Sequence, residues 1–463
     1  MTTETATATP TEQELRAFLT SKLNRNLRMY FDTCQRCGLC AESCHYFAAT
    51  QDPKMIPAYK AEQVRKLYRQ SNGWFRRLFP WLDGGNGNGF DEASLDALGD
   101  VVFGSCTMCR RCTIGCPFGI DIAMIMRAAR GMLTLAHQSP KGLQATVDMH
   151  LEHGNNMGTS SEDFVDTVQW VEEELQKAVG DPTAKIAIDE VGARNLWVVN
   201  PREIKYYPNL LLAQAKILHA AVEDITFGSQ YWDVTNYALF SGDDNAARTI
   251  AGFVLSEADR METKSIVCTE CGHGFRQLKY MAPLWLKRSD FQVRPFVDLM
   301  ARYIEEGRIK LDPSLNQERV TYHDPCNQAR SGNYIEEPRI ILRHSVSDFV
   351  ELTPHGRDNW CCGGGGGALT MSEFRDRRLA VGKVKADQIR ATGAKIVATS
   401  CHNCIDQIAE LSRHYKLGVK VVNLCELVAN ALVIESRAAA TAGSAVAAKS
   451  LQADVNQPHD QQT

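Results

Sequence analysis

Sixteen cysteines lie in this 463-residue chain, and five of them occur in three short motifs between residues 323 and 404. The motifs read His323-Asp324-Pro325-Cys326, then Trp360-Cys361-Cys362 followed by five glycines, then Cys401-His402-Asn403-Cys404. Adjacent cysteines do not easily bridge each other, so a vicinal pair at a glycine-rich turn indicates a metal cluster or a redox pair. Glycine lets the backbone approach a bulky ligand and donate N–H groups to its sulfurs. The competing interpretation is two buried structural cysteines beside an unrelated Cys-x-x-Cys pair.

Two copies of the spacing Cys-x-x-Cys-x-x-Cys-x-x-x-Cys lie before residue 120. This is the run of bacterial two-cluster ferredoxins, in which the fourth cysteine of each copy ligates the other cluster. We therefore predict two [4Fe-4S] cubanes with exchanged fourth ligands, and zinc is the alternative. The predicted sets are Cys34, Cys37, Cys40 and Cys116 for one cubane, and Cys106, Cys109, Cys112 and Cys44 for the other. His45 stands where proline usually follows the fourth cysteine, and we do not interpret it as a ligand.

The pattern Cys326…Cys361-Cys362-Gly363…Cys401-x-x-Cys404 resembles the CCG domain of heterodisulfide reductase catalytic subunits. The longer phrases, His323 to Asn327 and Cys361 to Gly367, look closest to cytoplasmic iron–sulfur subunits of Dsr- and Hmc-type membrane redox complexes. The resemblance covers roughly residues 14 to 435.

The resemblance implies that the five cysteines of these motifs hold a noncubane [4Fe-4S] cluster that acts on disulfides. Gly363, Gly364 and Gly365 would then line that cluster. His323 would orient a ligand or protonate a departing thiolate, and a structural histidine at a strand end is the alternative. His402 would donate a hydrogen bond to the cluster, against the alternative of a partly exposed loop residue.

Composition limits the other classes of function. The net charge of −4 offers no basic field for nucleic acid. No apolar run approaches the ~20 residues of a membrane span. The start, Met1-Thr2-Thr3-Glu4-Thr5, has neither a basic nor an apolar leader region, so we expect a cytoplasmic protein. In that compartment cysteines serve as metal ligands rather than as disulfides.

The expected fold is α/β, with an N-terminal, mainly helical two-cluster ferredoxin domain and two pseudo-symmetric α/β halves behind it. Helices are expected from Glu12, over residues 120–136 and over residues 162–179, and strand–helix alternation from residue 195 indicates largely parallel sheets. The expected divisions are a helical domain at 12–137, a connecting segment at 138–194, a degenerate CCG half at 195–312 and an intact CCG half at 313–435. Residues 1–11 and 436–463 are expected to be disordered.

The two halves differ in their cysteines. Arg202, Ala238 and Leu239 stand where the second half has Cys326, Cys361 and Cys362, so Cys268 and Cys271 alone remain in the first half. We interpret them as a vestigial or redox-active pair in a scaffold; a site shared with a partner and a buried dithiol are the alternatives. In the second half, Cys425 aligns with Val297 and is expected to be an inert core residue.

The favoured function is an electron-transfer subunit whose CCG cluster reacts with a disulfide or thiol, either a small molecule or a protein. The resemblance implies partner subunits, including a haem-bearing membrane subunit that would hold the chain at the inner membrane. The basic and aromatic segment from Lys60 to Leu82 would dock there or pack locally. The alternative is a relay subunit for a flavin-dependent glycerol-3-phosphate, lactate or glycolate dehydrogenase.

Overall fold

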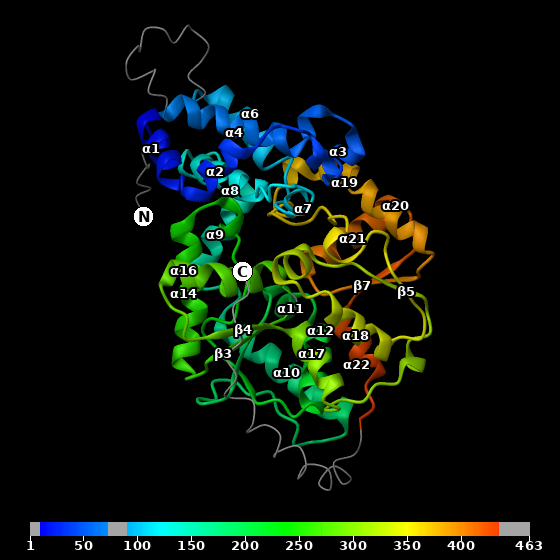
Figure 1. Cartoon of the computed structure of the whole chain (residues 1–463). Coiled ribbons are helices and arrows are strands. Elements are labelled where there is room, and N and C mark those ends of the chain that lie inside the picture. The colour runs from blue at the N-terminus through cyan, green and yellow to red at the C-terminus, as the bar shows by residue number, and fades with distance from the viewer. Residues whose placement is uncertain (1–9, 73–89, 270, 435–463) are drawn as a thin grey trace, which may run out of the picture.

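The computed structural model describes residues 10–72, 90–269 and 271–434 (Figure 1). The expected tail at 436–463 and most of the expected disordered start lie outside these residues. So do the aromatic run Trp74 to Leu82 and the glycine-rich loop Gly84 to Gly89. Thr11, which falls inside the segment expected to be disordered, instead caps the first helix, because its hydroxyl accepts the Glu14 N–H and the Glu14 carboxylate accepts the Thr11 N–H.

The N-terminal part is helical, as predicted. Its helices are α1 (Glu12–Lys22), α2 (Arg25–Thr33), α3 (His45–Thr50), α4 (Pro57–Asn72), α6 (Glu92–Val102), α7 (Arg111–Ile114) and α8 (Ile122–Leu135). The predicted helix over 120–136 starts at Ile122, because the Asp121 side chain caps it by accepting the Met124 N–H. Leu15 and Leu19 of α1 are buried in the core that these helices share with α8.

The C-terminal part contains two parallel four-stranded sheets of the same topology, which confirms the predicted α/β halves. The first sheet has the order β2-β1-β3-β4 and the second the order β6-β5-β7-β8. The strands of the first are β1 (Asn195–Val198), β2 (Ile225–Phe227), β3 (Ser265–Cys268) and β4 (Gln292–Pro295). Those of the second are β5 (Val320–Tyr322), β6 (Phe349–Val350), β7 (Ile396–Thr399) and β8 (Lys420–Asn423).

Helices connect and cover these strands. In the connecting segment and the first half they are α9 (Lys141–His153), α10 (Ser161–Val179), α11 (Pro201–Lys205), α12 (Pro208–Ala220), α13 (Ala238–Ser241), α14 (Asp244–Arg260), α15 (Gly272–Arg276), α16 (Ala282–Leu286) and α17 (Phe296–Glu305). In the second half they are α18 (Glu336–Ser345), α19 (Arg375–Val381), α20 (Lys383–Thr392), α21 (His402–His414) and α22 (Leu424–Ala431). The helix predicted over 162–179 is α10, and it packs against α12.

In each half, the long helix after the first strand packs against the last helix of the other half. Helix α12, which follows β1, contacts α22, and helix α17 contacts α18, which follows β5. One continuous apolar cluster therefore runs through both halves, and it includes the buried thiol of Cys425. Cys425 and Val297 occupy equivalent positions in the two halves, because each is the second residue of the helix that follows β8 or β4.

The Cys-x-x-Cys segments of the two halves are offset, which corrects the predicted alignment. Cys268 is the last residue of β3 and pairs with Pro295, whereas Thr399 ends β7 and pairs with Asn423. Cys268 thus has the register of Thr399, and Cys401 comes two residues later. Cys268 packs inside the first sheet's core with Leu196.

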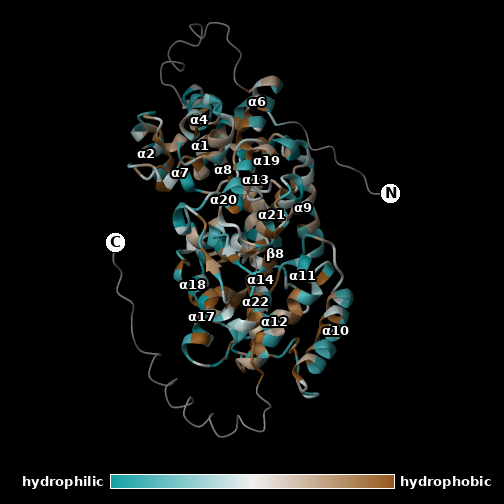
Figure 2. Cartoon of the chain, turned by 90° about the vertical axis from the view of Figure 1, so that its right-hand side faces the viewer, coloured by the Kyte–Doolittle hydropathy of each residue, from teal (hydrophilic) through white to brown (hydrophobic). Residues whose placement is uncertain are grey.

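The helical part lies at one end of the molecule and the α/β part at the other (Figure 2). Arg130 of α8, whose side chain is buried, connects them. Its guanidinium donates to the Cys106 and Val102 carbonyls of the helical part, to the Phe240 carbonyl of the first half and to the Gly366 carbonyl of the second. A buried arginine with four carbonyl partners fixes all three regions relative to one another.

Candidate metal centres

The first group of thiols lines a hollow at the surface of the helical part. The hollow is bounded by Cys34, Cys37, Cys40 and Cys116, with apolar side chains including Phe118 and Ile120. Cys34 caps the C-terminus of α2, and Gly38 turns the chain with φ +84° so that the next cysteines face the same space. Burial, with the neighbouring Cys34 and Cys116, raises the pKa of Cys40 to about 11. Cys37 is exposed, so this group reaches solvent.

The second group lies deeper and lines a separate hollow bounded by Cys44, Cys106, Cys109 and Cys112. Burial and the nearby thiols raise the pKa of Cys112. Cys112 borders both hollows, and the other seven cysteines divide between them as the exchanged sets predict; ligation itself remains a prediction.

Lys60 of α4 lies beside the second group. Its ammonium donates to the Ser105 carbonyl and lies 3.8 Å from the Cys44 sulfur. Lys60 and Arg65 are buried, whereas Lys66 and Arg69 of the same helix are exposed, so α4 has one face in the core and one in solvent; docking of this segment remains a prediction. The rest of the segment, from residue 73, lies outside the described residues.

The five cysteines of the CCG motifs gather at the C-terminal ends of β5 and β7. Cys326 follows β5, Cys401 precedes α21 and Cys404 lies in its first turn. The sulfurs of Cys362 and Cys404 are 3.4 Å apart. Hydrogen bonds from Cys361 and Cys404 hold the pKa of Cys362 below its ordinary value, and one from Cys404 lowers the pKa of Cys401 to about 6. Thiolates are the form that binds metal, so this donor set suits a cluster.

The glycine run contacts both the cysteine sulfurs and the helical part. The Gly363 N–H lies 3.4 Å from the Cys361 sulfur, and the Gly364 N–H lies 3.4 Å from the Cys362 sulfur; donation to a bound cluster remains a prediction. A side chain on Gly366 would come within 2.7 Å of the Thr107 carbonyl, and one on Gly365 within 3.5 Å of it. These later glycines therefore allow close contact with the helical part rather than with a ligand.

Two predicted histidines have different surroundings. His323 is buried, with a ring nitrogen within 4.8 Å of the sulfurs of Cys362 and Cys404, and burial lowers its pKa. His402 is also buried, so the partly exposed alternative is wrong. Its Nε2 lies 3.2 Å from a carboxylate oxygen of Glu203 in the first half, so that nitrogen serves Glu203 rather than a cluster sulfur.

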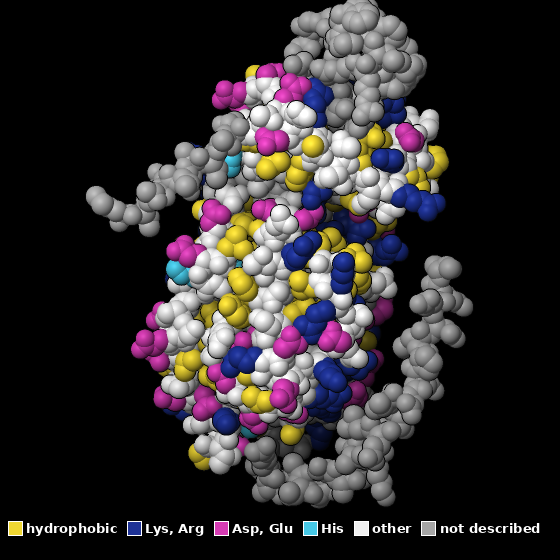
Figure 3. All heavy atoms as spheres, turned by 90° about the vertical axis from the view of Figure 1, so that its left-hand side faces the viewer, with side chains coloured by type: hydrophobic (Ala, Val, Ile, Leu, Met, Phe, Trp, Pro, Cys, Tyr) yellow, Lys and Arg dark blue, Asp and Glu magenta, His cyan; other side chains and the backbone are white. Residues whose placement is uncertain are grey.

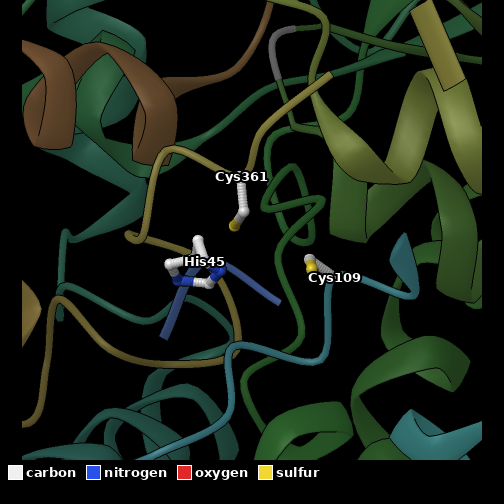
Figure 4. Close-up of side chains that lie close together, drawn as sticks. All are labelled: His45, Cys109 and Cys361. Carbon is white, nitrogen blue, oxygen red and sulfur yellow. The ribbon is translucent and has the colours of Figure 1, made fainter. Parts of the chain in front are cut away.

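His45 lies between the second group and the CCG cysteines, a position that the sequence motif does not reveal. A ring nitrogen of His45 and the sulfurs of Cys109 and Cys361 all lie within 4.8 Å of one another (Figure 4). A hydrogen bond to Cys361, with burial, raises the pKa of Cys109 to about 11. The Arg330 guanidinium donates to the Cys109 carbonyl at 2.8 Å and to the Asn359 carbonyl at 2.7 Å, which fixes the two loops together.

The Cys-x-x-Cys pair of the first half is fully buried, and burial raises the pKa of both Cys268 and Cys271. Burial raises the pKa of Cys326 in the same way, so the pKa does not separate this pair from the CCG cysteines; the difference is that Cys268 lies in the apolar core of the first sheet. The Gly272 N–H of this half donates to the Cys401 sulfur, so the first half supports the second-half site through its backbone.

The protein surface shows no single dominant charge on the face drawn in Figure 3, where basic and acidic side chains are interspersed. Among the helices of the described residues, none is long and apolar enough to span a bilayer.

Comparison with known proteins identifies both cysteine-rich regions. Residues 30–120 match the 4Fe-4S dicluster domain family, and residues 320–409 match the cysteine-rich domain CCG. The Hdr-like menaquinol oxidoreductase iron-sulfur subunit 2 of Archaeoglobus fulgidus is 28% identical, over 90% of this chain and 82% of that protein. A dihydromethanophenazine:CoB–CoM heterodisulfide reductase subunit of Methanosarcina mazei is 27% identical, over 88% of this chain and 96% of that protein. A probable membrane-anchored ferredoxin of Chromohalobacter salexigens is 27% identical, over 88% of this chain and 60% of that protein.

Proposed function

Because the chain belongs to the CCG-domain family of heterodisulfide reductase-related iron–sulfur proteins, we propose that it is the electron-transferring subunit of an oxidoreductase complex. Electrons would pass between a redox partner and a disulfide or thiol at the five CCG cysteines. The observation that carries the proposal is the order of the three thiol groups. The first reaches solvent at Cys37, the second is deeper, and Cys109 of the second contacts Cys361 of the third.

Each group would hold one cluster: two cubanes in the helical part, with exchanged fourth ligands, and a noncubane [4Fe-4S] cluster at the CCG cysteines. Iron–sulfur clusters supply one-electron storage at potentials that their surroundings tune. Reduction of a disulfide to two thiols takes two electrons and two protons, so the site must receive one electron at a time and supply protons at sulfur. His323, beside Cys362 and Cys404, and Thr107, 3.4 Å from the Cys361 sulfur, are groups that could donate hydrogen bonds to a departing sulfur.

The partner would be a haem-bearing membrane subunit, and the name of the menaquinol oxidoreductase relative supports exchange of electrons with a quinol. The exposed apolar side chains Leu39 and Phe118 surround the first thiol group, and we propose this surface as the contact with that partner. The chain would then lie at the cytoplasmic face of the membrane, held by its partner. We also propose the divisions at residues 137, 194 and 312 as the domain bounds.

The test compares the iron content, disulfide turnover and paramagnetic signals of wild-type protein and Cys361→Ala after both are reconstituted with iron. Wild-type protein should bind about 12 iron atoms, as three four-iron clusters. Cys361→Ala should lose disulfide turnover and the paramagnetic signal of the CCG cluster, while both N-terminal cubanes remain reducible. If the variant still turns over, catalysis lies in another subunit and this chain is a relay, as in the flavin-dehydrogenase alternative.

A further inference from the structure

A lysine that the proposed function does not use lies inside the second half. Lys385 of α20 is fully buried, and its ammonium donates to Oδ1 of Asn359 at 2.7 Å and to Oε1 of Gln388. Burial lowers the pKa of Lys385 to about 7. Among the described residues no carboxylate forms a salt bridge with it; the nearby Asp324 pairs with Arg339 instead. Lysine is almost never fully buried without a partner charge, so its position calls for a reason beyond packing.

Lys385 fixes which way the Asn359 side chain points. The Lys385 nitrogen donates to the Asn359 side chain and to Oε1 of Gln388, so the atom of Asn359 that faces it is the carbonyl oxygen. The amide nitrogen then points to the opposite side, where it lies 3.2 Å from Nδ1 of His323 and 3.3 Å from the Asp324 carbonyl. Asn359 is itself fully buried, so no solvent competes for either end.

The orientation of Asn359 in turn decides where His323 carries its proton. An amide NH₂ group only donates, so Nδ1 of His323 accepts, and a neutral imidazole then has its hydrogen on Nε2. Nε2 is buried and has no hydrogen-bond partner among the described residues. With Nδ1 taken by Asn359, Nε2 is the nitrogen left to serve the Cys362 and Cys404 sulfurs, which lie within 4.8 Å of the ring.

We infer that Lys385 is a positioning residue which, through Asn359, fixes His323 as the Nε2–H tautomer and so supplies an N–H donor to the sulfur ligands of the CCG cluster. The inference rests on the proposed function, because it assumes that the five cysteines bind a cluster. A hydrogen bond to a ligand sulfur stabilises the more negative, reduced state, so it raises the midpoint potential of that cluster. The same N–H faces the sulfur at which the first thiolate of a cleaved disulfide forms.

Asn359→Asp is the sharpest test, because it keeps the shape and exchanges the donor for an acceptor. A carboxylate accepts from both Lys385 and His323, which draws the imidazole hydrogen to Nδ1 and leaves a lone pair on Nε2 facing the sulfurs. Proton ENDOR of the paramagnetic CCG cluster, compared in H₂O and D₂O, should show in wild-type protein, besides the couplings of backbone donors such as the Gly363 and Gly364 N–H groups, one further exchangeable coupling from Nε2–H of His323. Asn359→Asp and His323→Ala should both lose it, and the midpoint potential of this cluster alone should become more negative.

Lys385→Met and Lys385→Arg form a second pair that leaves Asn359 in place. The Met variant frees the amide to flip and should weaken the exchangeable coupling, whereas the Arg variant retains a donor to Oδ1 and should restore it. Gln388→Leu is the matched control, because Gln388 contacts Lys385 but not His323 in the described structure; it should leave the coupling unchanged.

The outcomes separate this inference from the proposed function. An unchanged coupling and potential in both Asn359→Asp and Lys385→Met, with about 12 iron atoms retained, would overturn the inference and leave the proposed function standing. Wild-type protein with about 8 iron atoms would overturn both, because the CCG cysteines would then hold no cluster.

Discussion

The two α/β halves share a sheet order and crosswise helix packing, yet one gathers five thiols at its strand ends and the other buries two within its core. Where the second half has the loop Cys361–Gly367, the first half has helix α13. The carbonyls of Leu239 and Phe240 in α13 accept hydrogen bonds from Arg127 and Arg130 of the helical domain. The same position in the fold thus contacts Arg130 of the helical part in both halves, and in the second half it also carries the proposed cluster ligands Cys361 and Cys362.

A single residue shows how the first half supports the second. Arg202, which the sequence pattern aligns with Cys326 and the strand register places one residue beyond it, reaches across the interface and donates to Oδ1 of Asn403 at 2.9 Å. It also pairs with Asp406, so it holds the first turn of α21 in which Cys404 lies. The first half thus supplies an arginine that holds the helix carrying Cys404, a proposed ligand of the second half.

The proposed difference between the two halves would be wrong if the first-half thiols bound iron. We expect Cys362→Ser to lower the iron content from about 12 to about 8 atoms, because a hydroxyl does not replace a thiolate ligand. Cys271→Ser should leave the iron content and all paramagnetic signals unchanged, since the CCG motifs supply five thiols without it. Iron analysis with EPR measures both variants, and iron loss in Cys271→Ser would give the first half a ligand.

Arg130→Met tests the first half as an attachment surface. Removing four hydrogen bonds from a buried cation leaves carbonyls unpaired, so unfolding should become easier by about 3 kcal/mol or more. Arg127→Met is the matched control: it donates to one carbonyl of α13 and is partly exposed, and should cost about 1 kcal/mol. Denaturant unfolding of the iron-loaded protein compares the two, and equal costs would contradict the role of Arg130.

Arg202→Ala removes the contacts with Asn403 and Asp406 and should lower the free energy of unfolding by about 1–2 kcal/mol. The CCG cluster should become easier to remove with a chelator, while the N-terminal cubanes keep their wild-type rate of iron loss. Arg202→Lys retains the charge, so its rate of iron loss from the CCG cluster should lie between those of wild-type protein and Arg202→Ala. A chelation rate that does not depend on residue 202 would mean that α21 is positioned without the first half.

The smallest expected effects are losses of stability that should be equal in the two halves. Val297→Ala and Cys425→Ala remove small side chains at the same register of α17 and α22, so each should cost about 1–2 kcal/mol. Neither should change the iron content. Loss of iron in Cys425→Ala alone would show that this thiol is more than a core residue.

The sequence by itself determined the features that depend on local spacing. The cysteine runs specify which thiols share a turn, and strand–helix alternation from residue 195 specifies two parallel sheets. The equivalence of Cys425 and Val297 also follows from the repeat. The helix starts were predictable to within one or two residues where a cap such as Thr11 or Asp121 is present.

Only the tertiary structure decided the features that depend on contacts between distant segments. A buried lysine and a solvated one look alike in sequence, so Lys60 beside Cys44 and Lys385 beside Asn359 were invisible until helices α4 and α20 were packed. The two-residue offset of Cys268 depends on strand register, which pairing with β4 sets. His45 meets Cys361 across more than 300 residues, and His402 turns to Glu203, because the close-packed interface of the three regions leaves each ring one place to lie.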